Sequence, residues 1–195
     1  MRTSEILRKT AETDIRLSLN IDGTGRSSID SGCPFLDHML TLFARHGRFD
    51  LDLSCRGDVE VDYHHTVEDI GIALGSAFAK ALGEKRGIYR YGDRILPMDE
   101  TLILCAVDLS GRAHLSYDVA LPSPRVGDFD SELGEEFWLG FVRASACTLH
   151  IRELVGKNTH HILEGIFKAC GHALCDACEI DPRARGEIPS TKGVL

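Results

Sequence analysis

The chain has 195 residues, of which 43% are apolar and 27% charged, and it carries a net charge of −8. This composition is typical of one globular domain or two small fused ones and argues against disorder, while the acidic balance disfavours nucleic acid as the main partner. The sequence has no run of about 18 apolar residues, so it predicts no membrane span. Its seven scattered cysteines, an odd number, indicate reduced thiols in a cytoplasm rather than a disulfide framework.

The first half of the chain alternates strand-like and helix-like patterns. Its opening residues, 1–10, mix charged and apolar residues and lack the apolar core of a signal peptide. Strict alternation of polar and apolar residues predicts strands at residues 14–21, 49–53 and 59–62. Apolar residues at helical spacing predict helices at residues 36–45 and 65–84.

The second half continues this alternation. Strands are predicted at residues 101–109 and 114–119, joined across Ser110-Gly111-Arg112, and helices at residues 135–147 and 161–178. Residues 122–134 are polar and rich in Pro and Gly, which predicts a surface loop. Each half thus reads as strands, helix, strand and helix, a pattern typical of an α+β fold with helices against one sheet face.

An internal repeat organises the chain. Residues 64–81 align without gaps on residues 160–177, with eight identities in eighteen positions. The identical pairs, several of them three or four residues apart on one helical face, are His64/His160, His65/His161, Glu68/Glu164, Ile70/Ile166, Ala73/Ala169, Gly75/Gly171, Ala77/Ala173 and Ala81/Ala177. The chain therefore reads as two tandem duplicated half-domains, at about residues 10–92 and 93–189.

Each repeat carries a His-His-x-x-Glu motif that suits metal binding. The first His and the Glu lie on one helical face, whereas the second His points about 100° away. One helix therefore offers two ligands to one ion and a third ligand to another, and imidazole with carboxylate suits a divalent first-row ion. A lone His on a helix is more often a surface or core residue. Recurrence of all three polar groups in both halves favours ligation, and the His-Glu-x-x-His motif of zinc proteases is absent.

Three further clusters carry weaker signals. His38 heads a predicted helix and is either another ligand or a residue of the cap region. The Cys175-x-x-Cys178 pair lies late in an apolar helix, so we interpret it as core thiols rather than a redox pair. The segment Ile188–Gly193, with one cation and two hydroxyls, is a disordered end or, if it lies near a site, a phosphate clamp.

These residues together resemble the imidazoleglycerol-phosphate dehydratase family of histidine biosynthesis along nearly the whole chain. The matching motifs are Arg8-x-Thr10-x-Glu12-Thr13, Phe35-Leu36-Asp37-His38-Met39-Leu40, His64-His65-Thr66-Val67-Glu68-Asp69, Pro97-Met98-Asp99-Glu100, Asp108-Leu109-Ser110-Gly111-Arg112, Thr148-Leu149-His150-Ile151, Asn158-Thr159-His160-His161 and Pro189-Ser190-Thr191-Lys192-Gly193. The resemblance implies a single catalytic domain over residues 1–195, with helices packed between two four-stranded sheets and a C-terminal phosphate-binding tail. It also implies sites shared between subunits of a homo-oligomer of twenty-four chains built from trimers.

The resemblance implies two manganese ions per active site, with other divalent metals possible. Carried over by matching position, one ion takes His38, His64, Glu68 and His161. The other ion takes His65, His160, Glu164 and Glu136. The last of these departs from the family pattern, which usually has His there, but manganese tolerates oxygen ligands. Leu42 is a second departure, because many relatives have Gln at that position.

The reaction implied by the resemblance is that of a hydro-lyase, which converts imidazole glycerol phosphate to imidazole acetol phosphate. The hydrogen to be removed is not acidic. Two cations flanking the substrate ring would stabilise an imidazolate, which expels hydroxide and gives a diazafulvene-like intermediate with an acidified C–H bond.

Several residues are candidates for roles in that reaction. Glu12 is the preferred acid/base and substrate-binding residue, with Glu68 and Glu164 as alternatives if a metal-bound carboxylate acts. His46 either holds a substrate hydroxyl or is a helix C-terminal His favoured by the helix dipole. The candidates for binding the phosphate, by matched position, are Arg90, Arg112, Lys168, Ser190 and Lys192.

Two other functions fit parts of the pattern. A dinuclear phosphoester hydrolase would use a metal-bound hydroxide, although such enzymes usually carry more Asp ligands, and it would release inorganic phosphate. A metal-storing or metal-stapled shell would use the paired His helices to hold subunits together. That function would leave the phosphate candidates and the tail without a role.

Overall fold

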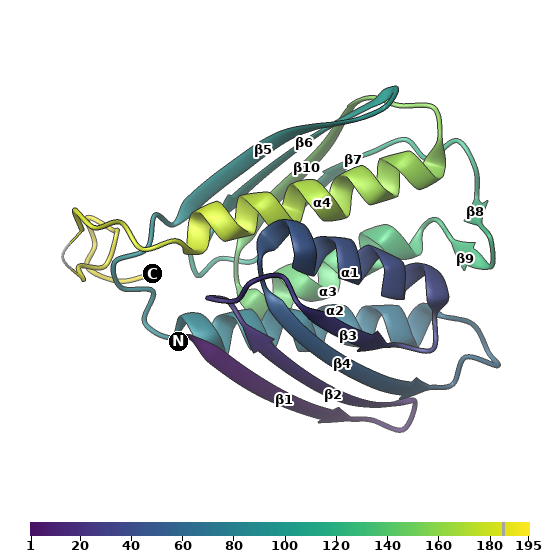
Figure 1. Ribbon diagram of the computed structural model, residues 1–195, viewed down its shortest axis with the longest axis horizontal. Helices are drawn as coiled ribbons and strands as arrows, with labels where there is room; N and C mark the ends of the chain where they lie inside the picture. The colour runs from purple at the N-terminus through teal and green to yellow at the C-terminus, as the bar shows by residue number, and fades with distance from the viewer. Residues whose placement is uncertain (185) are drawn as a thin grey trace.

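A computed structural model describes residues 1–184 and 186–195. Within these residues, four α-helices form a layer between two four-stranded sheets (Figure 1). The predicted α+β fold, with helices packed between two four-stranded sheets, is therefore confirmed.

The first sheet comes from the N-terminal half of the chain. Its strands, in the order β1-β2-β4-β3, are β1 (Thr3–Lys9), β2 (Thr13–Asn20), β4 (Asp50–Gly57) and β3 (Ser27–Asp30). Neighbouring strands are antiparallel except β3, which runs parallel to β4. Alternate side chains such as Leu17, Leu19 and Leu51 are buried against the helices, as the strict alternation predicts.

The second sheet has the same strand order and the same strand directions. Its strands, in the order β5-β6-β10-β7, are β5 (Tyr91–Met98), β6 (Thr101–Asp108), β10 (Thr148–Val155) and β7 (His114–Asp118). The connection at residues 110–112 links β6 to β7 without pairing them, because β10 lies between the two strands. The expected loop at residues 122–134 holds a short hairpin of β8 (Arg125–Val126) and β9 (Phe129–Asp130) before the next helix begins.

The four helices pack in two pairs. They are α1 (Pro34–Gly47), α2 (His64–Leu82), α3 (Leu133–Ser145) and α4 (Thr159–Cys178), close to the predicted bounds. Helix α1 packs against α4, and α2 packs against α3. Helix α2 also covers the first sheet, while α4 covers the second, so both motif-bearing helices are held between a partner helix and a sheet.

One predicted strand is wrong, and six strands of the described residues were not predicted. Residues 59–62 form a turn that leads into α2, because the pairing of β4 with β2 ends at Gly57 opposite Thr13. The strands without a prediction are β1, β3, β5, β10 and the two short strands β8 and β9 of the expected loop. No helix in the described part of the chain has both the length and the apolar character to cross a membrane.

Candidate metal centre

The two His-His motifs lie at the starts of helices. His64 is the first residue of α2, and the backbone N–H of His64 donates to Asp62 Oδ1 at 2.7 Å. In α4 the N-cap Asn158 accepts hydrogen bonds from the backbone N–H groups of His160 and His161. Both helix starts are therefore fixed by short polar side chains that precede the motif.

Adjacent imidazoles in each motif point in different directions. The ring planes of His64 and His65 meet at 87°, and those of His160 and His161 meet at 81°. A helix turns by about 100° per residue, so neighbouring side chains cannot face the same ion. Each helix start thus presents one imidazole on one side and one on another.

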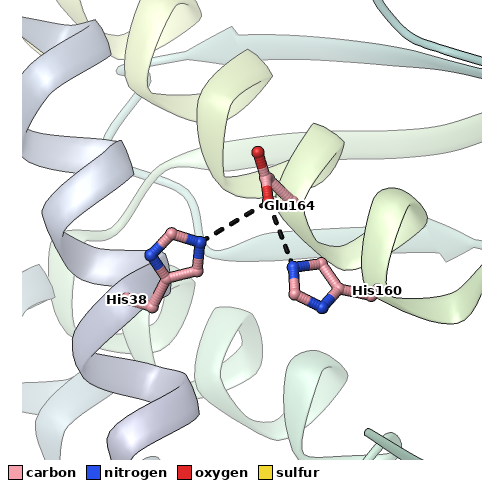
Figure 2. A group of neighbouring side chains, drawn as sticks. All are labelled: His38, His160 and Glu164. Carbon is pink, nitrogen blue, oxygen red and sulfur yellow. Dashed lines mark hydrogen bonds and ion pairs between the residues drawn. The ribbon is translucent and has the colours of Figure 1, made fainter.

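His38, His160 and Glu164 converge between α1 and α4 (Figure 2). The Nε2 atom of His160 lies 3.2 Å from Glu164 Oε2, and the Nε2 atom of His38 lies 3.6 Å from the same oxygen. One ligand atom from each residue lies within 4.8 Å of the other two. In the part of the chain that the structure describes, no second group of three His, Cys, Asp or Glu side chains converges this closely.

The carboxylate of Glu164 is held in its charged form. Burial raises the pKa of Glu164, but the hydrogen bond and charge of Lys168, followed by His160 and His38, outweigh this effect and lower it. Lys168 Nζ lies 2.5 Å from Oε1, which leaves Oε2 facing the two imidazoles.

The donor chemistry of this group fits a divalent cation. Two imidazole nitrogens and one carboxylate oxygen make a mixed nitrogen and oxygen set, which suits manganese, iron or zinc. The side chains of His38 and His160 are 50% and 41% exposed, so further ligands can approach from outside the chain. Three ligands with an open side are typical of a reactive metal site rather than a closed structural one.

This grouping differs from the one implied by the resemblance. There, His38 shared an ion with His64 and Glu68, whereas in the structure His38 lies with His160 and Glu164. The reason is the pairing of the helices, because α1, which carries His38, packs on α4 and not on α2.

Glycines at equivalent repeat positions allow both helix pairs to approach closely. A Cβ on Gly171 of α4 would lie 2.8 Å from the carbonyl oxygen of Phe43 in α1. A Cβ on Gly75 of α2 would likewise clash with the carbonyl oxygen of Phe141 in α3. Since Gly75 and Gly171 are matched in the repeat, α3 lies along α2 much as α1 lies along α4.

Glu136 lies in the first turn of α3, beside the helix that carries His64 and Glu68. All three side chains are half-buried. Phe43 of α1 meets Gly171, and Phe141 of α3 meets Gly75. His38 lies five residues before Phe43, and Glu136 lies five residues before Phe141. The position of Glu136 on α3 relative to α2 is therefore equivalent to the position of His38 on α1 relative to α4.

The second His of each motif is bonded to a carboxylate. His65 Nδ1 lies 2.9 Å from Asp58 Oδ2, and His161 Nδ1 lies 2.8 Å from Glu100 Oε2. These hydrogen bonds are the main reason that the pKa of each imidazole is raised. Glu12, the preferred acid/base candidate, places Oε1 3.7 Å from His65 Nε2, and its side chain is 50% exposed.

His46 forms a pair with a residue that the sequence did not single out. His46 Nδ1 lies 3.2 Å from Nε2 of His172 on α4, one turn beyond Lys168. Burial is the main cause that lowers the pKa of both imidazoles. A neutral imidazole pair therefore lies further along the same boundary between α1 and α4.

The phosphate candidates gather in two places. Arg90 forms a fork with Asp108, at 2.7 Å from Nε and 3.1 Å from Nη2, and Arg90 Nη1 donates to the carbonyl oxygen of Pro189 at 2.9 Å. Arg112 approaches the same Asp108 at 3.8 Å. Two cations and the start of the tail are thus brought together around one carboxylate.

The remaining phosphate candidates lie in the tail and on α4. Ser190 Oγ accepts from the backbone N–H of Lys192 at 3.2 Å, while the Lys192 side chain is exposed. Lys168 lies beside Glu164 instead, at the opposite edge of the metal group.

Sequence reasoning missed four polar residues whose side chains hydrogen-bond to those of candidate site residues, namely Asp58, Glu100, Asp108 and His172. Glu100 and Asp108 belong to matched motifs, so a signal was present without an assigned role. Asp58 and His172 have no distinguishing pattern in a single sequence. Only the packing of a loop or a helix against the motif reveals them.

Comparisons with known proteins identify relatives along the whole chain. The family model of imidazoleglycerol-phosphate dehydratase matches residues 31–174. The imidazoleglycerol-phosphate dehydratase of Pelobacter propionicus is 58% identical over 194 residues, which cover 100% of this chain and 99% of that protein. That of Acinetobacter baumannii is 55% identical over 194 residues, with 100% and 96% covered.

Two solved structures of imidazoleglycerol-phosphate dehydratases share the fold of this chain. The Staphylococcus aureus imidazoleglycerol-phosphate dehydratase superposes with a TM-score of 0.84 at 39% identity, over 92% of this chain and 99% of that one. The Pyrococcus furiosus enzyme superposes with a TM-score of 0.85 at 36% identity, over 97% and 100%.

Proposed function

The chain belongs to the imidazoleglycerol-phosphate dehydratase family, a metal-dependent hydro-lyase family of histidine biosynthesis, and on this premise we propose how its residues hold the metals and the substrate. The observation that carries the proposal is the convergence of His38, His160 and Glu164 at the boundary between α1 and α4. The intermediates expected from the sequence remain predictions.

We infer that one chain contributes three ligands to each of two manganese ions. His38, His160 and Glu164 would hold the first ion. Their equivalents on the other helix pair, Glu136, His64 and Glu68, would hold the second. When bound, the two cations would act as Lewis acids that withdraw electrons from the substrate imidazole.

His65 and His161 are left to complete these sites in neighbouring subunits. Each points away from the preceding His of its own motif and bonds a carboxylate at the start of its helix. A homo-oligomer of twenty-four subunits with shared sites, as expected from the resemblance, would bring these imidazoles to a partner's ligands. The same sharing would make the two pseudo-repeats of residues 1–195 one catalytic domain.

The other candidate residues would bind and orient the substrate. Glu12, exposed beside His65, would take the proton from the substrate carbon and also contact the substrate. Glu68 and Glu164 remain the alternative carriers of that proton. His46, with its ring oriented by His172, would contact a substrate hydroxyl.

The phosphate would bind where Arg90, Arg112 and the tail meet. Arg90 offers a planar fork already oriented by Asp108, while Ser190 and Lys192 lie just beyond the backbone group that Arg90 holds. Lys168, beside Glu164, would neutralise charge near the metal rather than at this cluster. All seven cysteines are free thiols, which supports function in a reducing cytoplasm.

The test is a direct assay of the manganese-loaded protein with imidazole glycerol phosphate. We expect the ketone product, imidazole acetol phosphate. Glu12→Gln should lose turnover while keeping its metal content, and Glu5→Gln, an exposed carboxylate on β1, should change neither. Failure to form the ketone with any divalent metal would contradict the proposed function.

A further inference from the structure

The second imidazole of each motif has its Nδ1 atom occupied by a carboxylate. His65 bonds Asp58 and His161 bonds Glu100, at 2.9 Å and 2.8 Å. A carboxylate only accepts hydrogen bonds, so Nδ1 must carry the proton in both rings. In the neutral imidazole, the lone pair is then on Nε2. Two contacts that are unrelated in sequence thus select the same tautomer.

Glu100 is anchored on both of its oxygens. Its Oε2 accepts from His161, while its Oε1 accepts from the backbone N–H of Asn158 at 2.9 Å and the hydroxyl of Thr101 at 3.2 Å. One carboxylate therefore ties the turn between β5 and β6 to the start of α4 and to the His161 ring.

Asp58 makes the equivalent connection in the first half. It directly follows β4, its backbone N–H donates to the carbonyl oxygen of Glu12 at 3.1 Å, and its side chain reaches His65. Asp58 is thus joined both to the turn between β1 and β2 and to the motif of α2. In each half, the second imidazole is oriented by a residue of a neighbouring loop rather than by its own helix.

We propose that Asp58 and Glu100 are positioning residues that hold His65 and His161 with Nε2 free to bind metal. This inference rests on the proposed function, because it assigns these imidazoles to metal sites. Carboxylates that orient a ligating imidazole through its other nitrogen fix its tautomer and ring direction and raise its basicity. Neither carboxylate needs to touch the ion.

The test compares Asp58→Asn and Glu100→Gln with the parent in the assembled protein. Manganese affinity and stoichiometry are measured by equilibrium dialysis with metal analysis, and assembly is checked by light scattering. Each variant should bind one of the two manganese ions about 10–100-fold more weakly, which is the usual effect of losing a carboxylate that orients a ligating imidazole. Asp50→Asn is the matched control, because the Asp50 carboxylate also accepts hydrogen bonds from backbone N–H groups but contacts no imidazole.

A double variant shows whether Glu100 acts through His161. His161→Ala should weaken metal binding, and adding Glu100→Gln should cause no further loss of affinity. Additive losses would overturn the proposal, as would a Glu100→Gln protein that is less stable yet binds both ions with the affinity of the parent. If the parent itself binds no divalent metal, the proposed function fails and the positioning role fails with it.

Discussion

Replacing Glu164 by Gln tests the candidate metal centre most directly. Glu164 is the one carboxylate in the converging group, and its Oε2 lies 3.2 Å and 3.6 Å from the two imidazoles. Its side chain is only 10% exposed, so water cannot replace the lost charge well. Gln keeps the size and shape of the side chain but carries no negative charge.

The expected loss follows from the electrostatics of a buried carboxylate. Two unit charges at about 4 Å attract by about 4 kcal/mol at an effective dielectric constant near 20, and a divalent cation doubles this figure. A loss of about 4 kcal/mol is already about a 1000-fold loss of affinity. We therefore expect the Glu164→Gln protein to lose one of two manganese ions per subunit at concentrations that saturate the parent.

Equilibrium dialysis followed by metal analysis measures this stoichiometry. Lys168→Met is the control, because it breaks the ion pair with Glu164 without removing a proposed ligand, and it should keep both ions. A Glu164→Gln protein that binds two ions with unchanged affinity would refute the assignment of this carboxylate as a ligand.

Three further perturbations test the surroundings of the site. Gly171→Ala places a methyl group against the backbone of α1 and should cost about 1–3 kcal/mol of unfolding free energy in urea; unchanged stability would contradict the close helix contact. Arg90→Lys keeps the charge but loses the paired hydrogen bonds to Asp108 and the bond to the Pro189 carbonyl, so KM should rise by about tenfold or more with a smaller change in kcat. A fall in kcat with an unchanged KM would argue against phosphate binding. Burial lowers the pKa of His46 and His172 below the usual value of 6.5 in the folded state. As the pH falls, the unfolded chain therefore takes up protons at a higher pH than the folded chain, and the folded state loses stability. His172→Gln should therefore flatten the fall in Tm of the metal-free protein between about pH 7 and pH 5, and a slope equal to that of the parent would contradict this origin.

The helices could be predicted from the sequence because their apolar faces are long and regular. Strands were harder to predict where a local pattern conflicts with the tertiary structure. The segment of β5 contains Gly92 and Pro97, which usually argue against a strand, yet Gly92 is needed because a Cβ would clash with the Ala173 carbonyl oxygen of α4. Conversely, Val59 and Val61 alternate with acids as a strand would, but both are exposed in a turn with no strand opposite.

The site was predictable in its chemistry but not in its grouping. The spacing of His160 and Glu164 on one face follows from helix geometry alone, and the structure places them 3.2 Å apart. The position of His38 depends instead on which helix packs against α4, and no local pattern encodes that choice. The roles of Asp58 and Glu100 depend in the same way on loops that meet the motif only after folding.

The proposed pairing of helices also makes the two metal sites chemically unequal. The site on α1 and α4 has two imidazoles and one carboxylate, whereas Glu136 gives the site on α2 and α3 one imidazole and two carboxylates. Oxygen ligands favour harder cations such as manganese, and imidazole favours zinc more strongly. Zinc added to the manganese-loaded protein should therefore displace the two manganese ions at different zinc concentrations, the first at the site of His38. In the Glu136→His protein, both ions should be displaced at similar zinc concentrations. Two equal steps in the parent would show that Glu136 does not contribute a ligand.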